Sequence, residues 1–156
     1  MCGRFTLTAP PDALARAFEL VKAPPLSPRY NIAPSQPVPA VRLVLQAGGR
    51  ALDLLRWGLI PSWAKDAKIG NRMINARAET AASKPAFRHA IRRSRCLVIA
   101  DGFYEWEKTG GWKQPWFFRM QDGKPFAFAG LWDRWEGPEG EPIESCTLLT
   151  TVPNGL

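Results

Sequence analysis

Residues 96–132 read CLVIADGFYEWEKTGGWKQPWFFRMQDGKPFAFAGLW, in which runs of apolar and aromatic residues alternate with short glycine-containing segments. Runs of this length and composition, bounded by glycine, are typical of β-strands joined by tight turns. The separating segments lie at 101–102, 109–111 and 122–123. The stretch therefore predicts consecutive strands, which we place at Cys96–Ala100, Phe103–Lys108, Trp112–Met120 and Pro125–Trp132.

Strand patterns continue on both sides of this stretch. The apolar run Cys146–Thr151 predicts a last strand, and the alternation in Arg4–Thr8 predicts a first one. Val38–Leu45 and Ala51–Trp57 flank Ala47-Gly48-Gly49, which is typical of a β-hairpin. Strands are thus expected to dominate the chain.

Helices are expected in only two places. Pro11 opens a helical pattern with Leu14 and Phe18 on one face, and Thr80–Arg93 carries apolar residues at helical spacing with basic residues opposite. The prolines between residues 24 and 39 remove backbone donors and predict an irregular loop over residues 23–39. A basic, tryptophan-bearing loop is expected at Pro61–Asn71.

Composition excludes several classes of protein. A chain of 156 residues with 46% hydrophobic and 22% charged residues can bury one core, and its 13 glycines and 15 prolines argue against a bundle of long helices. One histidine and three dispersed cysteines cannot form an ordinary zinc site, so we expect no metal and no cofactor. No apolar run could span a bilayer or act as a signal peptide, which predicts a soluble, cytoplasmic protein with reduced thiols and no membrane partner. The net charge of +7 favours polyanionic partners, nucleic acid first.

Cys2 is the first candidate catalytic residue. Removal of Met1 would leave a free amine and a thiol on the same residue. These groups ordinarily titrate near pH ~8 and ~8.5, so modest local help makes either one nucleophilic. The amine can condense with an aldehyde to an imine, and the sulfur can then close a stable thiazolidine ring. A basic protein meets such an aldehyde in the ring-opened sugar of an abasic site in DNA.

Five sequence blocks carry a family resemblance. They are Cys2-Gly3-Arg4-Phe5, Arg29-Tyr30-Asn31-Ile32-Ala33-Pro34, Arg56-Trp57-Gly58-Leu59-Ile60-Pro61-Ser62-Trp63, Ile74-Asn75-Ala76-Arg77-Ala78-Glu79-Thr80 and Ala100-Asp101-Gly102-Phe103-Tyr104-Glu105-Trp106. In this order they resemble the SRAP family of abasic site processing proteins. The resemblance implies one α+β domain over residues 1–156, built on a curved, mainly antiparallel, barrel-like sheet with a few short helices. It also implies a role in the SOS response to DNA damage.

The resemblance also implies roles for individual residues. Cys2 would form the covalent thiazolidine crosslink to an abasic site in single-stranded DNA. Asn75 would hold the cysteine and the sugar in place, and Glu105 would act as the general acid and base. Arg4 and Arg77 would bind phosphates flanking the site.

Trp63, in the basic loop, is our candidate for stacking on a base beside the lesion. The partner of the protein would be single-stranded DNA that contains abasic sites. The protein would bind it as a monomer and would be associated with the nucleoid while bound. Weak lyase activity, from an imine that fails to close, and self-processing peptidase activity at Met1 are related expectations.

The C-terminal end departs from the family pattern. Family members continue past Thr150-Thr151-Val152-Pro153-Asn154 into an Ile-His-x-Arg-Met-Pro-like motif, and this sequence ends at Leu156. We therefore expect that the C-terminal part of the domain is missing. His89 lies on the predicted basic helix and does not take the place of the motif's histidine.

Two other function classes remain open from the sequence. Met1-Cys2-Gly3 also resembles the start of N-terminal-nucleophile amidohydrolases, in which the thiol attacks an amide and the amine is the base. A non-catalytic single-stranded DNA-binding module is the other alternative. Ammonia release from glutamine would identify the first. Equal, salt-sensitive binding of intact and abasic strands would identify the second.

Overall fold

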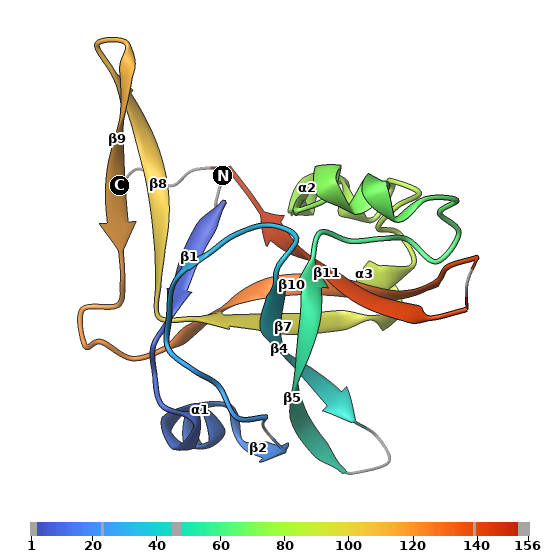
Figure 1. Ribbon diagram of the computed structural model, residues 1–156, viewed down its shortest axis with the longest axis horizontal. Helices are drawn as coiled ribbons and strands as arrows, with labels where there is room; N and C mark the ends of the chain where they lie inside the picture. Colours follow the sequence, from blue (N-terminus) through green and yellow to red (C-terminus); the bar gives the residue numbers. More distant parts are fainter. Residues whose placement is uncertain (1–2, 23, 45–47, 139, 153–156) are drawn as a thin grey trace.

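The strands form a closed barrel and a smaller sheet packed beside it in this computed structural model (Figure 1). The structure describes residues 3–22, 24–44, 48–138 and 140–152. In chain order the elements are β1 (Arg4–Leu7), α1 (Pro11–Phe18), β2 (Leu20–Lys22), β3 (Arg29–Ile32), β4 (Pro37–Val44), β5 (Gly49–Trp57), the 3-10 helix η2 (Ala67–Arg72), β6 (Asn75–Arg77), α2 (Ala78–Ala81), α3 (Ala90–Arg93), β7 (Arg95–Ala100), β8 (Gly102–Thr109), β9 (Trp112–Phe118), β10 (Phe126–Glu136) and β11 (Pro142–Thr150).

The barrel closes because β11 pairs back onto β5. Its strands follow the order β5-β4-β7-β10-β11, with β2 and β6 added beside β5 and β11. Within the ring of five strands, neighbours run antiparallel except for β11 and β5, which run parallel. The added strands β2 and β6 also run parallel to β5 and β11. Directions cannot alternate all the way round a ring with an odd number of strands, so at least one neighbouring pair must be parallel. The expected α+β fold with a curved, mainly antiparallel, barrel-like sheet is confirmed.

The smaller sheet, in the order β3-β1-β8-β9, is antiparallel throughout. Aromatic rings join it to the barrel. Phe5 of β1 is fully buried and contacts Trp57, with ring centroids 5.2 Å apart, and Phe128 at 5.9 Å. Phe103 of β8 meets Phe126 and Phe128 edge to face. Phe5, the second residue of β1, therefore holds this strand against the barrel.

An arginine links four barrel strands. Arg42 of β4 donates to Asp53 of β5 and, through both terminal nitrogens, to the carboxylate of Glu144 on β11, each at 2.9 Å. Its guanidinium also lies 4.4 Å from the ring centre of Trp132 on β10. Bidentate and stacked contacts of this kind require arginine rather than lysine, so this network adds specificity to the barrel closure.

The expectation of an irregular loop over residues 23–39 is wrong in part. Arg29–Ile32 forms β3, and β4 begins at Pro37. The prolines at 28 and 34 flank β3 instead of interrupting it, and β3 is an edge strand paired with β1 alone. Pro39 lies in β4 just before the ladder with β7 begins at Ala40, so its missing amide costs no bond to β7.

The other expected elements are present with shifted ends. The hairpin of β4 and β5, the five strands after residue 94 and the two short helices α2 and α3 are confirmed, although β10 extends to Glu136 and β11 begins at Pro142. The basic loop contains the 3-10 helix η2. The strands β2 and β6 are only three residues long, too short for a recognisable alternation.

Candidate functional site

The first strand leads from Gly3, which precedes it, past the neighbourhood of Glu105. In the ladder between β1 and β8, Arg4 is opposite Tyr104 and Phe5 is opposite Phe103. Glu105 is the next residue of β8 in the direction of the chain start. Cys2 itself lies outside the described residues. In the sequence it is three residues before Phe5, whose ring is fixed in the core.

A second chain of contacts leads from β1 to Asn75. Phe5 packs on Trp57, and the indole Nε1 of Trp57 donates to the carbonyl of Ile74 at 2.9 Å. The amide of Leu148 donates to the same carbonyl, and Asn75 then pairs with Leu148 as β6 runs parallel to β11. In Figure 1, the beginning of β1 accordingly lies between β8 and the end of β11.

The alternation of side chains determines which candidates share a face of the small sheet. Phe103 faces the barrel, since it packs on Phe126 and Phe128, so Glu105 lies on the same, inner face of β8. Arg4 is opposite Tyr104 and belongs to the outer face. Asn75, Glu105 and Arg4 are all partly buried. The structure thus brings Asn75, Glu105 and Gly3 to one rim. The side chain of Arg4 lies on the opposite, outer face of the sheet.

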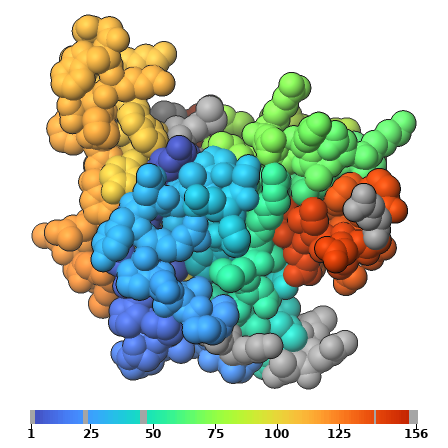
Figure 2. All heavy atoms as spheres, in the orientation of Figure 1, coloured from blue at the N-terminus to red at the C-terminus, as the bar shows by residue number. Residues whose placement is uncertain are grey.

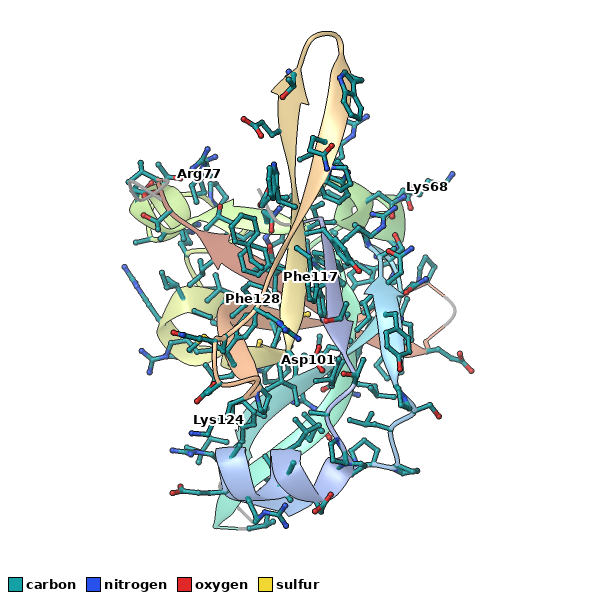
Figure 3. The ribbon with its side chains drawn as sticks, turned by 90° about the vertical axis from the view of Figure 1, so that its left-hand side faces the viewer. Lys68, Arg77, Asp101, Phe117, Lys124 and Phe128 are labelled. Carbon is teal, nitrogen blue, oxygen red and sulfur yellow. The ribbon has the colours of Figure 1, made fainter. Side chains whose placement is uncertain are left out.

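Arg77 lies at the same rim, two residues after Asn75. Its side chain is exposed, and one terminal nitrogen donates to the carbonyl of Thr151 at 3.3 Å. Figure 3 shows Arg77 at the edge of the molecule, to one side of the β8–β9 hairpin. An exposed guanidinium held in this way retains free donors for an anion.

Trp63 lies in a separate pocket. This pocket has a volume of about 520 Å³ and is open to solvent; its lining includes Trp63, Arg88, His89 and Asp133. Trp63 is 60% exposed, and Asp133 accepts a hydrogen bond from the neighbouring Ser62 amide at 2.8 Å. Asp133 pairs with Ser145 of β11, and Asn75 pairs with Leu148, three residues farther along the same strand. Measured along β11, the pocket and Asn75 are therefore about 10 Å apart. His89 is exposed.

The other two cysteines are unsuited to nucleophilic chemistry. Cys96 and Cys146 are free thiols buried in the barrel, as the sequence predicted for reduced cysteines. Burial raises the pKa of Cys96 to about 12 and raises the pKa of Cys146 well above its usual value. Both therefore remain protonated at neutral pH. Among the residues that the structure describes, no group of three metal-ligating side chains comes together.

Asp101 fixes the chain after β1 to the turn between β7 and β8. Its carboxylate accepts hydrogen bonds from the hydroxyl of Thr6, from the amide and hydroxyl of Thr8, and from the amide of Ala9. Burial alone would raise the pKa of Asp101, but these hydrogen bonds outweigh it and lower the pKa below its usual value. Asp101 belongs to one of the five sequence blocks, but nothing in the sequence indicated this anchoring contact.

Asp101→Asn is expected to lower the free energy of unfolding at neutral pH by about 1–3 kcal/mol, because an amide cannot accept all these bonds. A carboxyl whose folded pKa is lowered stabilises the fold above its unfolded pKa, and this contribution is lost as pH falls through the folded pKa. The difference between wild type and variant should therefore shrink below pH ~4 in urea titrations. A difference that stays constant down to pH ~3 would contradict the assignment. Asp122→Asn, in an exposed turn, is the control and should change stability little.

Comparison with known proteins shows which family the chain belongs to. It belongs to the SOS response associated peptidase (SRAP) family, whose sequence model matches residues 1–156. It is 45% identical over 160 residues to the abasic site processing protein YoqW of Bacillus subtilis, covering 100% of this chain and 70% of that protein. The chicken (Gallus gallus) abasic site processing protein HMCES is 35% identical over 152 residues, covering 79% of this chain and 45% of that protein.

Solved structures agree with the fold. A crystal structure of a protein from Bacteroides thetaiotaomicron superposes with a TM-score of 0.86 at 26% identity, covering 98% of this chain and 69% of the other. One from Bordetella bronchiseptica gives 0.82 at 28% identity, covering 99% and 74%. The chain is thus an SRAP family, abasic site processing protein. None of the helices in the described ranges is both long and apolar enough to cross a membrane.

Proposed function

We propose that this chain captures abasic sites in single-stranded DNA by a covalent bond to Cys2. The observation that carries the proposal is the convergence of three strands at one rim: β1, which follows Cys2, pairs with the strand of Glu105 and packs through Trp57 onto the segment before Asn75. Relatives named abasic site processing proteins support the substrate class.

The proposed chemistry uses both groups of an unblocked Cys2. The amine attacks the aldehyde carbon of the ring-opened sugar, and the resulting carbinolamine loses water to form an imine. The thiolate then attacks the same carbon while the imine nitrogen takes up a proton. Amine, thiol and aldehyde thus give a thiazolidine and one water, and the ring resists hydrolysis better than the imine does. An imine that does not close can undergo β-elimination, which would appear as weak lyase activity.

The neighbouring side chains fit this sequence of steps. Glu105 can accept a proton from the amine and return it to the departing hydroxyl, because a carboxylate held beside the reacting groups can act first as general base and then as general acid. Asn75 can orient the cysteine and the sugar without titrating. Arg4 and Arg77 would bind phosphates on the two sides of the rim, and Trp63 would stack on a base farther along the strand. Removal of Met1, by the chain itself or otherwise, must come first.

The test is incubation of the mature chain with a uracil-excised oligonucleotide. We expect a protein–DNA band that survives denaturing electrophoresis, with a mass equal to the sum of the two components less one water. An otherwise identical oligonucleotide with a tetrahydrofuran analogue has no aldehyde and should give no such band. If the aldehyde-containing strand also gives none, with Met1 shown by mass spectrometry to be absent, the proposal fails.

A further inference from the structure

The hairpin of β8 and β9 stands clear of the rest of the molecule (Figure 2). Its side chains alternate between two faces, and cross-strand pairs share a face. The acidic face is the inner one and carries Phe103, Glu105, Glu107, Thr109, Trp112, Gln114, Trp116 and Phe118. The cationic face is the outer one and carries Tyr104, Trp106, Lys108, Lys113, Pro115 and Phe117.

Charge is segregated completely between these two faces. Both carboxylates of the hairpin, Glu105 and Glu107, lie on the acidic face, whereas both lysines lie on the cationic face. Lys108 and Lys113 are directly opposite each other, an arrangement that destabilises a strand pair unless an anion lies between them. The ion pairs made by the described residues involve neither lysine. The cationic face therefore offers positive charge that the described part of the chain does not neutralise.

Aromatic rings lie on the same face, between the lysine pair and the base of the hairpin. Trp106 is 41% exposed and Phe117 is 48% exposed. Tyr104 contacts both, with ring centroids 6.5 Å and 5.0 Å away, and its hydroxyl donates to the carbonyl of Tyr30. Gly102 has no side chain to block the Phe117 ring, since a Cβ there would lie only 2.1 Å from it. The rings are thus held in place on the sheet with part of their surface open.

The cationic face continues to the proposed capture site. Arg4 pairs with Tyr104 and so extends this face onto β1, next to Gly3. Figure 3 places Phe117 at the base of the projecting hairpin, beside β1. A strand held at the rim could therefore pass directly onto the hairpin.

Exposed aromatics next to unneutralised lysines suit an unpaired nucleic acid strand. Bases stack on aromatic side chains without regard to sequence, and lysines neutralise the phosphates between them. A protein partner fits less well, because lysine is depleted in protein interfaces.

We propose that the cationic face of the hairpin is a stacking platform that binds unpaired nucleotides adjoining the captured site. This inference rests on the proposed function for its substrate, a single DNA strand. It assigns a binding role to Trp106, Lys108, Lys113 and Phe117.

The experiment measures binding of a fluorescein-labelled oligothymidylate without abasic sites, by anisotropy at several salt concentrations. Each phosphate contact contributes about 0.7 to the slope of log K against log salt for single strands, so Lys108→Gln/Lys113→Gln should reduce that slope by about 1.4. Trp106→Ala should weaken binding about tenfold through lost stacking. Both variants should also raise the concentration of abasic strand needed for half-maximal crosslinking.

Two matched controls separate this face from general effects. Arg16→Gln removes an exposed cation from α1, at the opposite end of the molecule from the hairpin in Figure 1. Trp112→Ala removes a tryptophan that is 62% exposed but lies on the acidic face. Both should bind within about twofold of wild type.

Unchanged affinity and slope in both cationic-face variants would overturn the inference, even if wild type forms the crosslink. A wild type that binds through this face but forms no crosslink would instead refute the proposed function and leave the platform standing. If Trp106→Ala turned a dimer into a monomer in light scattering while DNA binding stayed unchanged, the face would serve self-association and the inference would be wrong.

Discussion

Cys2→Ala is expected to abolish the denaturation-stable crosslink to abasic DNA, whereas Cys2→Ser is expected to separate the two steps of the reaction. Alanine keeps the amine but has no nucleophile to close a ring. Serine keeps the amine and a poorer nucleophile, because an alcohol is far less ionised than a thiol at neutral pH. Borohydride should therefore trap the imine in both variants, while the untreated reaction should yield a stable band only with wild type.

The matched control for these variants is another cysteine. Cys96→Ala removes a buried thiol whose pKa of about 12 keeps it protonated, so it should crosslink like wild type. A stable band from Cys2→Ala, or loss of the band in a folded Cys96→Ala protein, would contradict the assignment of Cys2. Failure of borohydride to trap any imine would argue that the amine is not the first nucleophile.

Glu105→Gln should slow crosslink formation by about 10²- to 10⁴-fold, the usual contribution of a positioned acid or base. The amide has the same size and can still form hydrogen bonds, but it cannot take a proton from the amine or give one to the departing hydroxyl. The rate is measured under single-turnover conditions with excess protein, by following the band over time. Raising the pH should partly rescue the variant, because more amine is then unprotonated without help.

Glu107→Gln provides the comparison for this prediction. Glu107 lies on the same face of the same strand, and its carboxylate accepts a hydrogen bond from the Trp116 indole at 2.9 Å, which an amide oxygen can also accept. This variant should crosslink at the wild-type rate. Equal slowing of both variants would indicate a general electrostatic effect of the acidic face and would argue against a specific role for Glu105.

Much of the fold follows from local patterns in the sequence. The four strands between residues 95 and 136 and the hairpin of β4 and β5 were predicted because apolar alternation and glycine turns are local signals. Short elements such as β2 and β6 were missed. The proline-rich segment was misjudged, because the sequence does not show that β3 is an edge strand, where flanking prolines cost nothing.

The candidate site, too, could be predicted from the sequence only in part. Cys2, Asn75 and Glu105 were chosen for their chemistry and for the motifs around them, which a linear sequence can display. Their convergence depends on nonlocal pairings: β1 with β8, β6 with β11, and the ring of Trp57 between Phe5 and Ile74. No local pattern encodes these contacts.

The sequence by itself determined three properties of the protein. These are the aminothiol that forms once Met1 is removed, the excess of positive charge and the high content of strands. Only the tertiary structure decided which face each side chain occupies. Lys108 and Glu107 are neighbours in the chain, yet they lie on opposite faces of the hairpin. The physical reason is that strand side chains alternate, so the face is set by register, and register depends on which strand lies alongside.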